Sequence, residues 1–83
     1  MNTASPSRIL TSHRVMTLKN LSEKLPTVSD VNVYIQILSE AEEILSFLSE
    51  HFLSVFPEND RSYDLMYNTW KNAELKLNTD ILP

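Results

Sequence analysis

The two histidines are the side chains best suited to acid–base or metal chemistry, but neither has the neighbours that such chemistry needs. His13 and His51 have no second histidine and no carboxylate three or four residues away. This excludes the helical His-x-x-x-His and Glu-x-x-His patterns of metal sites. The chain also lacks cysteine, so thiolate ligands and cysteine nucleophiles are excluded. We therefore expect no metal, no cofactor, no catalytic residue and no enzymatic activity.

Glutamates recur along the middle of the chain and could in principle supply paired acid and base carboxylates. However, Glu40, Glu43 and Glu50 fall on one face of the helix predicted there, away from most of its apolar residues. This placement favours a solvated acidic face. A functional alternative is that the acidic face attracts a basic partner or imitates the phosphates of a nucleic acid, as an inhibitor would.

An aromatic cluster near the C-terminus has two interpretations. Tyr63, Met66, Tyr67 and Trp70 recur at helical spacing, which predicts packing against the preceding helix. Tyrosine and tryptophan are also favoured anchors of protein interfaces. We therefore include Tyr67 and Trp70 among the candidate partner-binding residues.

The absence of glycine narrows the architectures that remain possible. Gly-rich phosphate loops, dinucleotide fingerprints and nucleophile elbows use backbone geometry that glycine supplies, and the sequence contains none. Its 83 residues suffice for one domain with a small core. No apolar run is long enough to cross a membrane, and the first residues do not resemble a secretory signal. We expect a cytoplasmic protein.

The stretch from Val31 to Phe56 predicts one long central helix. Two apolar series run seven residues apart through it: Val31, Leu38, Leu45 and Phe52, and Tyr34, Ala41, Leu48 and Val55. Ile37 and Ile44 widen this seam on one side, and Ile35 and Phe56 widen it on the other. A seam of this width favours at least two packing neighbours, and one of them can belong to another chain.

Helix boundaries follow from the residues on either side of this stretch. Thr27 and Asp30 have the spacing of a capping box, and Ser29 or Asp30 are alternative caps. Pro57 ends the helix, and the short turn that follows favours an antiparallel return helix over residues 61–79. The return helix is shorter than the central one. It therefore leaves Val31, Tyr34 and Ile35 to be covered by the N-terminal helix, by a partner or by the tail residues Ile81 and Leu82. Our candidate partner-binding residues on the central helix are Val31, Tyr34, Ile35 and Leu38.

The segment 8–25 is open to two interpretations. Val15, Leu18, Leu21 and Leu25 have helical spacing, whereas Arg14 to Leu18 could form a short strand. We favour the helix. Basic residues dominate this segment and acidic residues dominate the central one, so we expect the two to meet, within one chain or between two.

Together these features predict an all-α fold: an antiparallel helical hairpin with a short N-terminal helix, a small three-helix bundle that dimerises. Residues 1–7 are predicted to be a disordered tail and residues 8–83 a single helical domain. We expect a small protein-protein interaction module, an adaptor, chaperone-like protein or inhibitory regulator that binds a protein partner through apolar helix faces. A membrane and a small-molecule substrate are not expected.

The alternative function is a dimeric DNA-binding regulator that uses the basic N-terminal segment. A strand over residues 14–18, followed by two helices, would be similar in element order to a ribbon-helix-helix repressor. Against this function, the second helix is too long for that family and the net charge of the chain is −4, whereas nucleic-acid binding depends on cations that neutralise phosphates.

Overall fold

The computed structural model describes residues 6–81, with side chains for residues 6–79, and within this part of the chain the regular structure is entirely helical. Helix α1 spans Pro6–Lys24 and is followed by a short 3-10 turn over Leu25–Thr27. Helix α2 spans Val31–Val55, and helix α3 spans Tyr63–Ile81. The predicted all-α fold is confirmed, and the strand alternative for residues 14–18 is wrong, because those residues lie inside α1.

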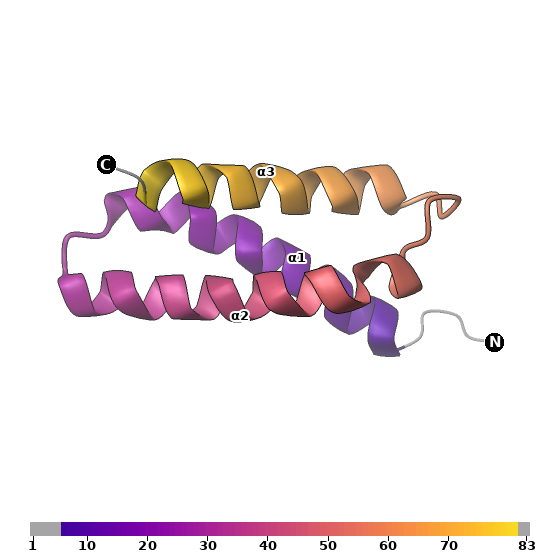
Figure 1. Ribbon diagram of the computed structural model, residues 1–83, viewed down its shortest axis with the longest axis horizontal. Helices are drawn as coiled ribbons and strands as arrows, with labels where there is room; N and C mark the ends of the chain where they lie inside the picture. The colour runs from indigo at the N-terminus through magenta and orange to yellow at the C-terminus, as the bar shows by residue number, and fades with distance from the viewer. Residues whose placement is uncertain (1–5, 82–83) are drawn as a thin grey trace.

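Helices α2 and α3 run antiparallel, as the short turn predicts, and α1 crosses them diagonally (Figure 1). The backbone of α1 comes close to both other helices, whereas α2 and α3 come close to each other at few points. The three-helix arrangement agrees with the predicted small bundle, but the N-terminal helix is not the short one expected. Helix α1 is as long as α3, 19 residues each. It packs against both α2 and α3.

The core contains residues from all three helices. Its members from α1 and the turn after it are Val15, Leu18 and Leu25; those from α2 and its end are Ile37, Ala41, Ile44, Leu48, Phe52 and Phe56; those from α3 are Trp70, Ala73 and Leu77. The buried face of α2 is therefore centred nearer to Ile37 and Ile44 than the heptad series predicts. The reason is α1, which packs beside Ile44.

Helix α1 begins earlier than predicted. Pro6 and Ser7, assigned to the tail from the sequence, are its first residues, while residues 1–5 and 82–83 lie outside the described part of the chain. Proline suits a first helical position because its φ is already helical and its missing N–H would have no intrahelical partner there. Two residues later, Arg8 is held by Asp60, which anchors this first turn to the rest of the bundle.

Helix α2 starts at the acidic cap that the sequence offers. The Asp30 carboxylate accepts hydrogen bonds from the backbone N–H groups of Asn32 and Val33, at 2.8 and 3.2 Å, and so satisfies two donors that lack helical partners. Thr27 does not cap this helix; its hydroxyl donates to the carbonyl of Lys24 at 2.7 Å. At the other end, Phe56 leaves helical geometry just before Pro57.

Candidate functional site

A hollow of about 240 Å³ lies between α2 and α3. It exists because the two backbones stay apart along most of their length while α1 fills only one side of the space between them. We call this hollow the α2–α3 groove. Its walls are mainly apolar, with one carboxylate and one amide: Leu38, Ala41, Glu42 and Leu45 from α2, and Leu77 and Asn78 from α3.

Two exposed aliphatic residues extend the groove toward the start of α2. Val31 is 66% exposed and Ile35 is 55% exposed. Val31 and Ile35 are four residues apart, and Ile35 and Leu38 are three apart, so each is a neighbour of the next on the helix surface. We call Val31, Ile35, Leu38 and Leu45 the apolar stripe of α2. Tyr34 is half-buried and packs against the core instead.

Trp70 is a core residue, in agreement with the predicted packing against the preceding helix, and it offers little exposed surface to a partner. Its side chain is 7% exposed, and its ring centroid lies 4.9 Å from that of Phe52 and 5.7 Å from that of Tyr67. The indole Nε1 has no hydrogen-bond partner among the described residues. Trp70 therefore bridges α3 to α2 from inside, and of the two aromatic candidates only the half-buried Tyr67 reaches the surface.

Lys71 is a residue of this region that the sequence reasoning missed. Its Nζ lies 4.1 Å from the centroid of the Trp70 ring and 5.6 Å from that of Tyr67. It also pairs with Glu74 at 3.5 Å. The spacing could have indicated these contacts, because Lys71 follows Trp70 directly and stands four residues after Tyr67 and three before Glu74. The positive charge of Lys71 is thus engaged within α3.

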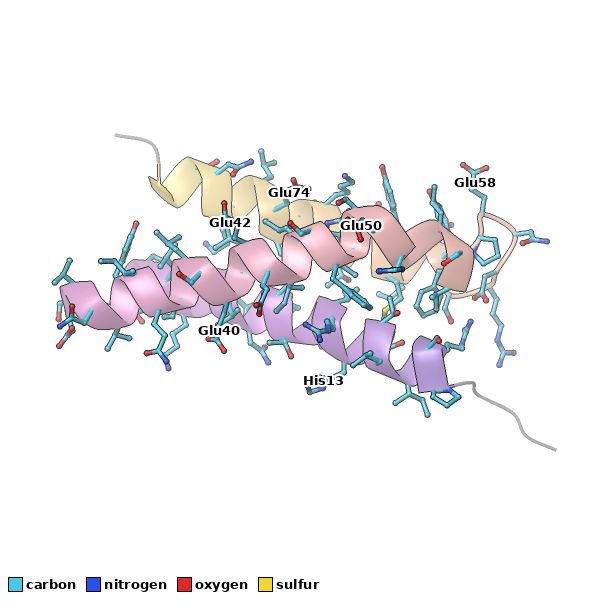
Figure 2. The ribbon with its side chains drawn as sticks, turned by 60° about the horizontal axis from the view of Figure 1, so that its bottom comes forward. His13, Glu40, Glu42, Glu50, Glu58 and Glu74 are labelled. Atoms are coloured by element: carbon cyan, nitrogen blue, oxygen red, sulfur yellow. The ribbon has the colours of Figure 1, made fainter. Side chains whose placement is uncertain are left out.

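The three residues of the predicted acidic face are all exposed, but they do not share one environment. Glu40 and Glu43 line a hollow of about 260 Å³ with His13, Arg14, Thr17 and Ile44. Glu50 lies 3.6 Å from the Nε2 atom of His51. Figure 2 shows Glu40 on the side of α2 that faces α1, and Glu42 on the side that faces α3. Glu42, which the predicted acidic face does not include, is the carboxylate of the groove.

Arg8 fastens the start of α1 to the turn between α2 and α3. Its guanidinium donates to the two carboxylate oxygens of Asp60 at 2.5 and 3.2 Å and to the hydroxyl of Ser62 at 3.2 Å, and it lies 4.6 Å from the Phe56 ring centroid. The hydrogen bond from Arg8 lowers the pKa of the Asp60 carboxyl, and the backbone N–H of Ser62 lowers it further. The basic segment thus meets an acid within one chain.

Arg14 contacts an aromatic ring of the central helix and not one of its glutamates. Its guanidinium lies 4.7 Å from the Phe47 ring centroid, and Lys19 pairs with Glu23 inside α1 at 2.8 Å. Arg8, Arg14 and Lys19, three cations of the basic N-terminal segment, are therefore already engaged with other residues of the chain. Their contacts give no support to the DNA-binding alternative.

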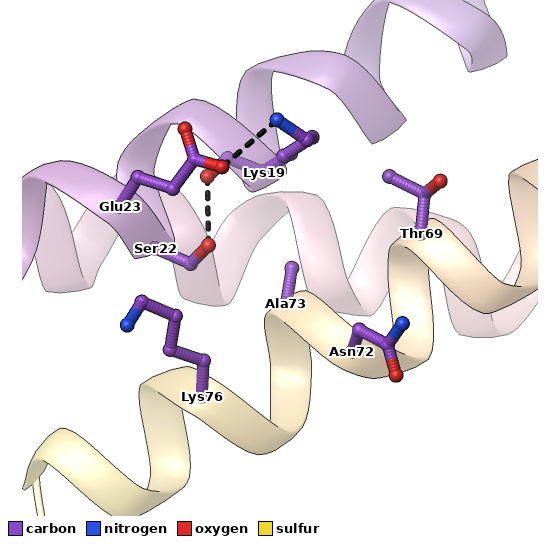
Figure 3. A pocket seen from close by; sticks show the side chains of 7 residues that line it. All are labelled: Lys19, Ser22, Glu23, Thr69, Asn72, Ala73 and Lys76. Carbon is purple, nitrogen blue, oxygen red and sulfur yellow. Dashed lines mark hydrogen bonds and ion pairs between the residues drawn. The ribbon is translucent and has the colours of Figure 1, made fainter.

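A polar hollow of about 370 Å³ lies between α1 and α3. Two small buried residues, Ser22 and Ala73, form part of its wall, and Lys19, Glu23, Thr69, Asn72 and Lys76 complete it (Figure 3). Ser22 donates to the carbonyl of Lys19 at 2.7 Å. The hollow marks the place where small side chains meet between the two helices, and its charges include both signs.

Among residues 6–79, no three histidine or acidic side chains come together in a way that could hold a metal ion. None of the described helices is long and apolar enough to cross a membrane. No family model matches the chain, and neither the curated proteins nor the solved structures include a significant match. The α2–α3 groove and the exposed residues of the apolar stripe are surface features of the described chain that could receive a ligand.

Proposed function

We propose that the chain is a small non-enzymatic interaction module that binds a helix of a partner protein. The partner helix lies along the apolar stripe of α2 and in the α2–α3 groove. The observation that carries this proposal is the exposure of two β-branched residues, Val31 and Ile35, in line with the groove. Helix-in-groove recognition uses apolar anchors at this kind of spacing.

The dimensions support a helix as the ligand. From Val31 to Leu45 the stripe extends over about 21 Å at 1.5 Å per residue, so a partner helix of about four turns could cover it. A fourth helix in this position would have α2 and α3 on either side. It would extend the bundle without displacing α1, which lies mainly on the other side of the groove.

Burial of the exposed anchors supplies a driving force. Complete burial of a valine or isoleucine side chain contributes about 1.5–3 kcal/mol. More than half of the surface of Val31 and of Ile35 is exposed in the free chain. Both lie on a continuous helix, so little backbone ordering is needed on binding, which reduces the entropy cost of association.

The test compares two double variants that remove similar exposed apolar area. Val31→Ser with Ile35→Ser removes the anchors, whereas Leu65→Ser with Leu75→Ser changes residues of α3 that are 65% and 66% exposed and lie outside the groove lining. The probe is a fluorescein-labelled 18-residue helical peptide with a leucine seam and glutamine elsewhere, followed by anisotropy. We expect binding to be lost only in the Val31 and Ile35 variant. Equal binding to all three proteins, or none to the unchanged chain, would contradict the proposal.

The homodimer and the cytoplasmic location expected from the sequence stay predictions, as do the two alternative functions. A DNA-binding regulator requires salt-sensitive association that weakens when Arg14 and Lys19 are replaced. An acidic inhibitor requires a partner that distinguishes the chain from a variant lacking Glu40, Glu43 and Glu50.

A further inference from the structure

We propose that the helix bound in the α2–α3 groove is cationic: an amphipathic helix of another protein whose apolar seam is flanked by lysine or arginine. This inference rests on the proposed function and specifies its partner. It follows from the charge that lines the groove, from the contacts that α1 already makes with α2, and from the cost of placing a second copy there.

The charge of the groove is negative. Glu42 lines it and has no ion-pair or hydrogen-bond partner among residues 6–79. Lys71, on α3, is already engaged with Glu74 and with the Trp70 ring. In addition, α2 carries four glutamates and no lysine or arginine, so its field favours an approaching cation. An incoming basic side chain would give Glu42 a partner.

The bundle itself shows how α2 accepts a basic helix. Helix α1 packs on α2 with the Arg14 guanidinium over the Phe47 ring and the Arg8 guanidinium over the Phe56 ring. Cations are attracted to ring faces by the aromatic quadrupole. On α2, the half-buried Tyr34 stands four residues before the groove residue Leu38 and is an aromatic side chain of the same kind, whereas Tyr67 of α3 already lies beside Lys71. The partner helix would thus use the chemistry that α1 uses.

A second copy of the chain fits this surface less well. Two copies that paired through α2 would bring together two helices that each carry Glu40, Glu42, Glu43 and Glu50 and no lysine or arginine. Like charges placed across an interface oppose association. The apolar stripe favours a helical ligand, and the glutamates of α2 favour a basic one. A cationic helix of another protein meets both conditions.

The experiment uses three labelled 18-residue peptides with the same leucine seam, flanked by lysine, glutamine or glutamate. We expect the lysine peptide to bind the full chain at least fivefold more tightly than the glutamine peptide at low salt, with a smaller difference at high salt because mobile ions screen exposed charges. We expect the glutamate peptide to bind least tightly. Glu42→Gln should lower the affinity for the lysine peptide about two- to fivefold and leave the affinity for the glutamine peptide unchanged.

Glu40→Gln is the matched control, because it makes the same change in net charge on the side of α2 that faces α1. We expect it to have less than half the effect of Glu42→Gln on the logarithm of affinity. Equal binding of the lysine and glutamine peptides would overturn the cationic partner and leave the groove proposal standing. Absence of binding by every peptide would overturn both proposals. A dimer that the Val31 and Ile35 serine variant converts to a monomer would show that a second copy occupies the groove.

Discussion

Replacing Leu18 with alanine should destabilise the whole bundle, because Leu18 lies in the one helix that both others share. Its side chain is 0% exposed, and α1 approaches α2 and α3 more closely than they approach each other. If α1 were an accessory to an independent α2–α3 hairpin, the same substitution would loosen α1 alone.

The expected loss is large compared with the stability of so small a domain. Leucine to alanine removes three carbon atoms, worth about 2.4 kcal/mol at about 0.8 kcal/mol each. The residual cavity raises the total to about 3–5 kcal/mol. A chain of this length has a free energy of unfolding of about 4–12 kcal/mol, so the variant should lose between a quarter and all of it.

Urea unfolding followed by two probes tests this reasoning. Circular dichroism at 222 nm reports all three helices, whereas fluorescence of Trp70, the single tryptophan, reports the packing of α3 on Phe52 of α2. We expect both transitions to shift together to lower urea. Leu75→Ala, at a residue that is 66% exposed, should change stability by less than about 0.5 kcal/mol. A partial loss of helicity with an unchanged Trp70 transition would refute the central role of α1.

Three further predictions concern single contacts. Thr11→Val should raise the free energy of unfolding by about 1 kcal/mol, measured with urea, because the buried Thr11 hydroxyl has no hydrogen-bond partner among the described residues. The hydroxyl of Thr69 donates to the carbonyl of Leu65, so the control Thr69→Val should give no such gain. Asp30→Ala should lower the free energy of unfolding in urea by about 1 kcal/mol, because the N-cap of α2 is lost. Asp60→Asn should lower the thermal midpoint at pH 7. Since contact with Arg8 lowers the pKa of Asp60 in the folded state, its stabilisation is present above the unfolded pKa and disappears as pH falls below about 4. The midpoints of the variant and the unchanged chain should therefore converge in acid, and a constant difference across pH would contradict this account.

Helix α2 could be predicted from the sequence because its boundaries depend on local chemistry, whereas the spacing over residues 8–25 was also compatible with a short strand. Asp30 accepts from the first backbone donors of α2, and Pro57 prevents the helix from continuing. The width of the apolar seam also predicted two packing neighbours for α2, and the structure supplies them as α1 and α3. Spacing along one helix is a local property, so these features need no knowledge of the rest of the fold.

The positions of the neighbours around α2 could only come from the tertiary structure. Heptad spacing treats the residues on either side of a wide seam alike, whereas packing by α1 beside Ile44 buries one side and leaves Val31 and Ile35 exposed. The same packing separates Glu42, in the groove, from Glu40, beside α1. A helical pattern fixes which residues share a face, but the direction of that face depends on contacts between residues far apart in the chain.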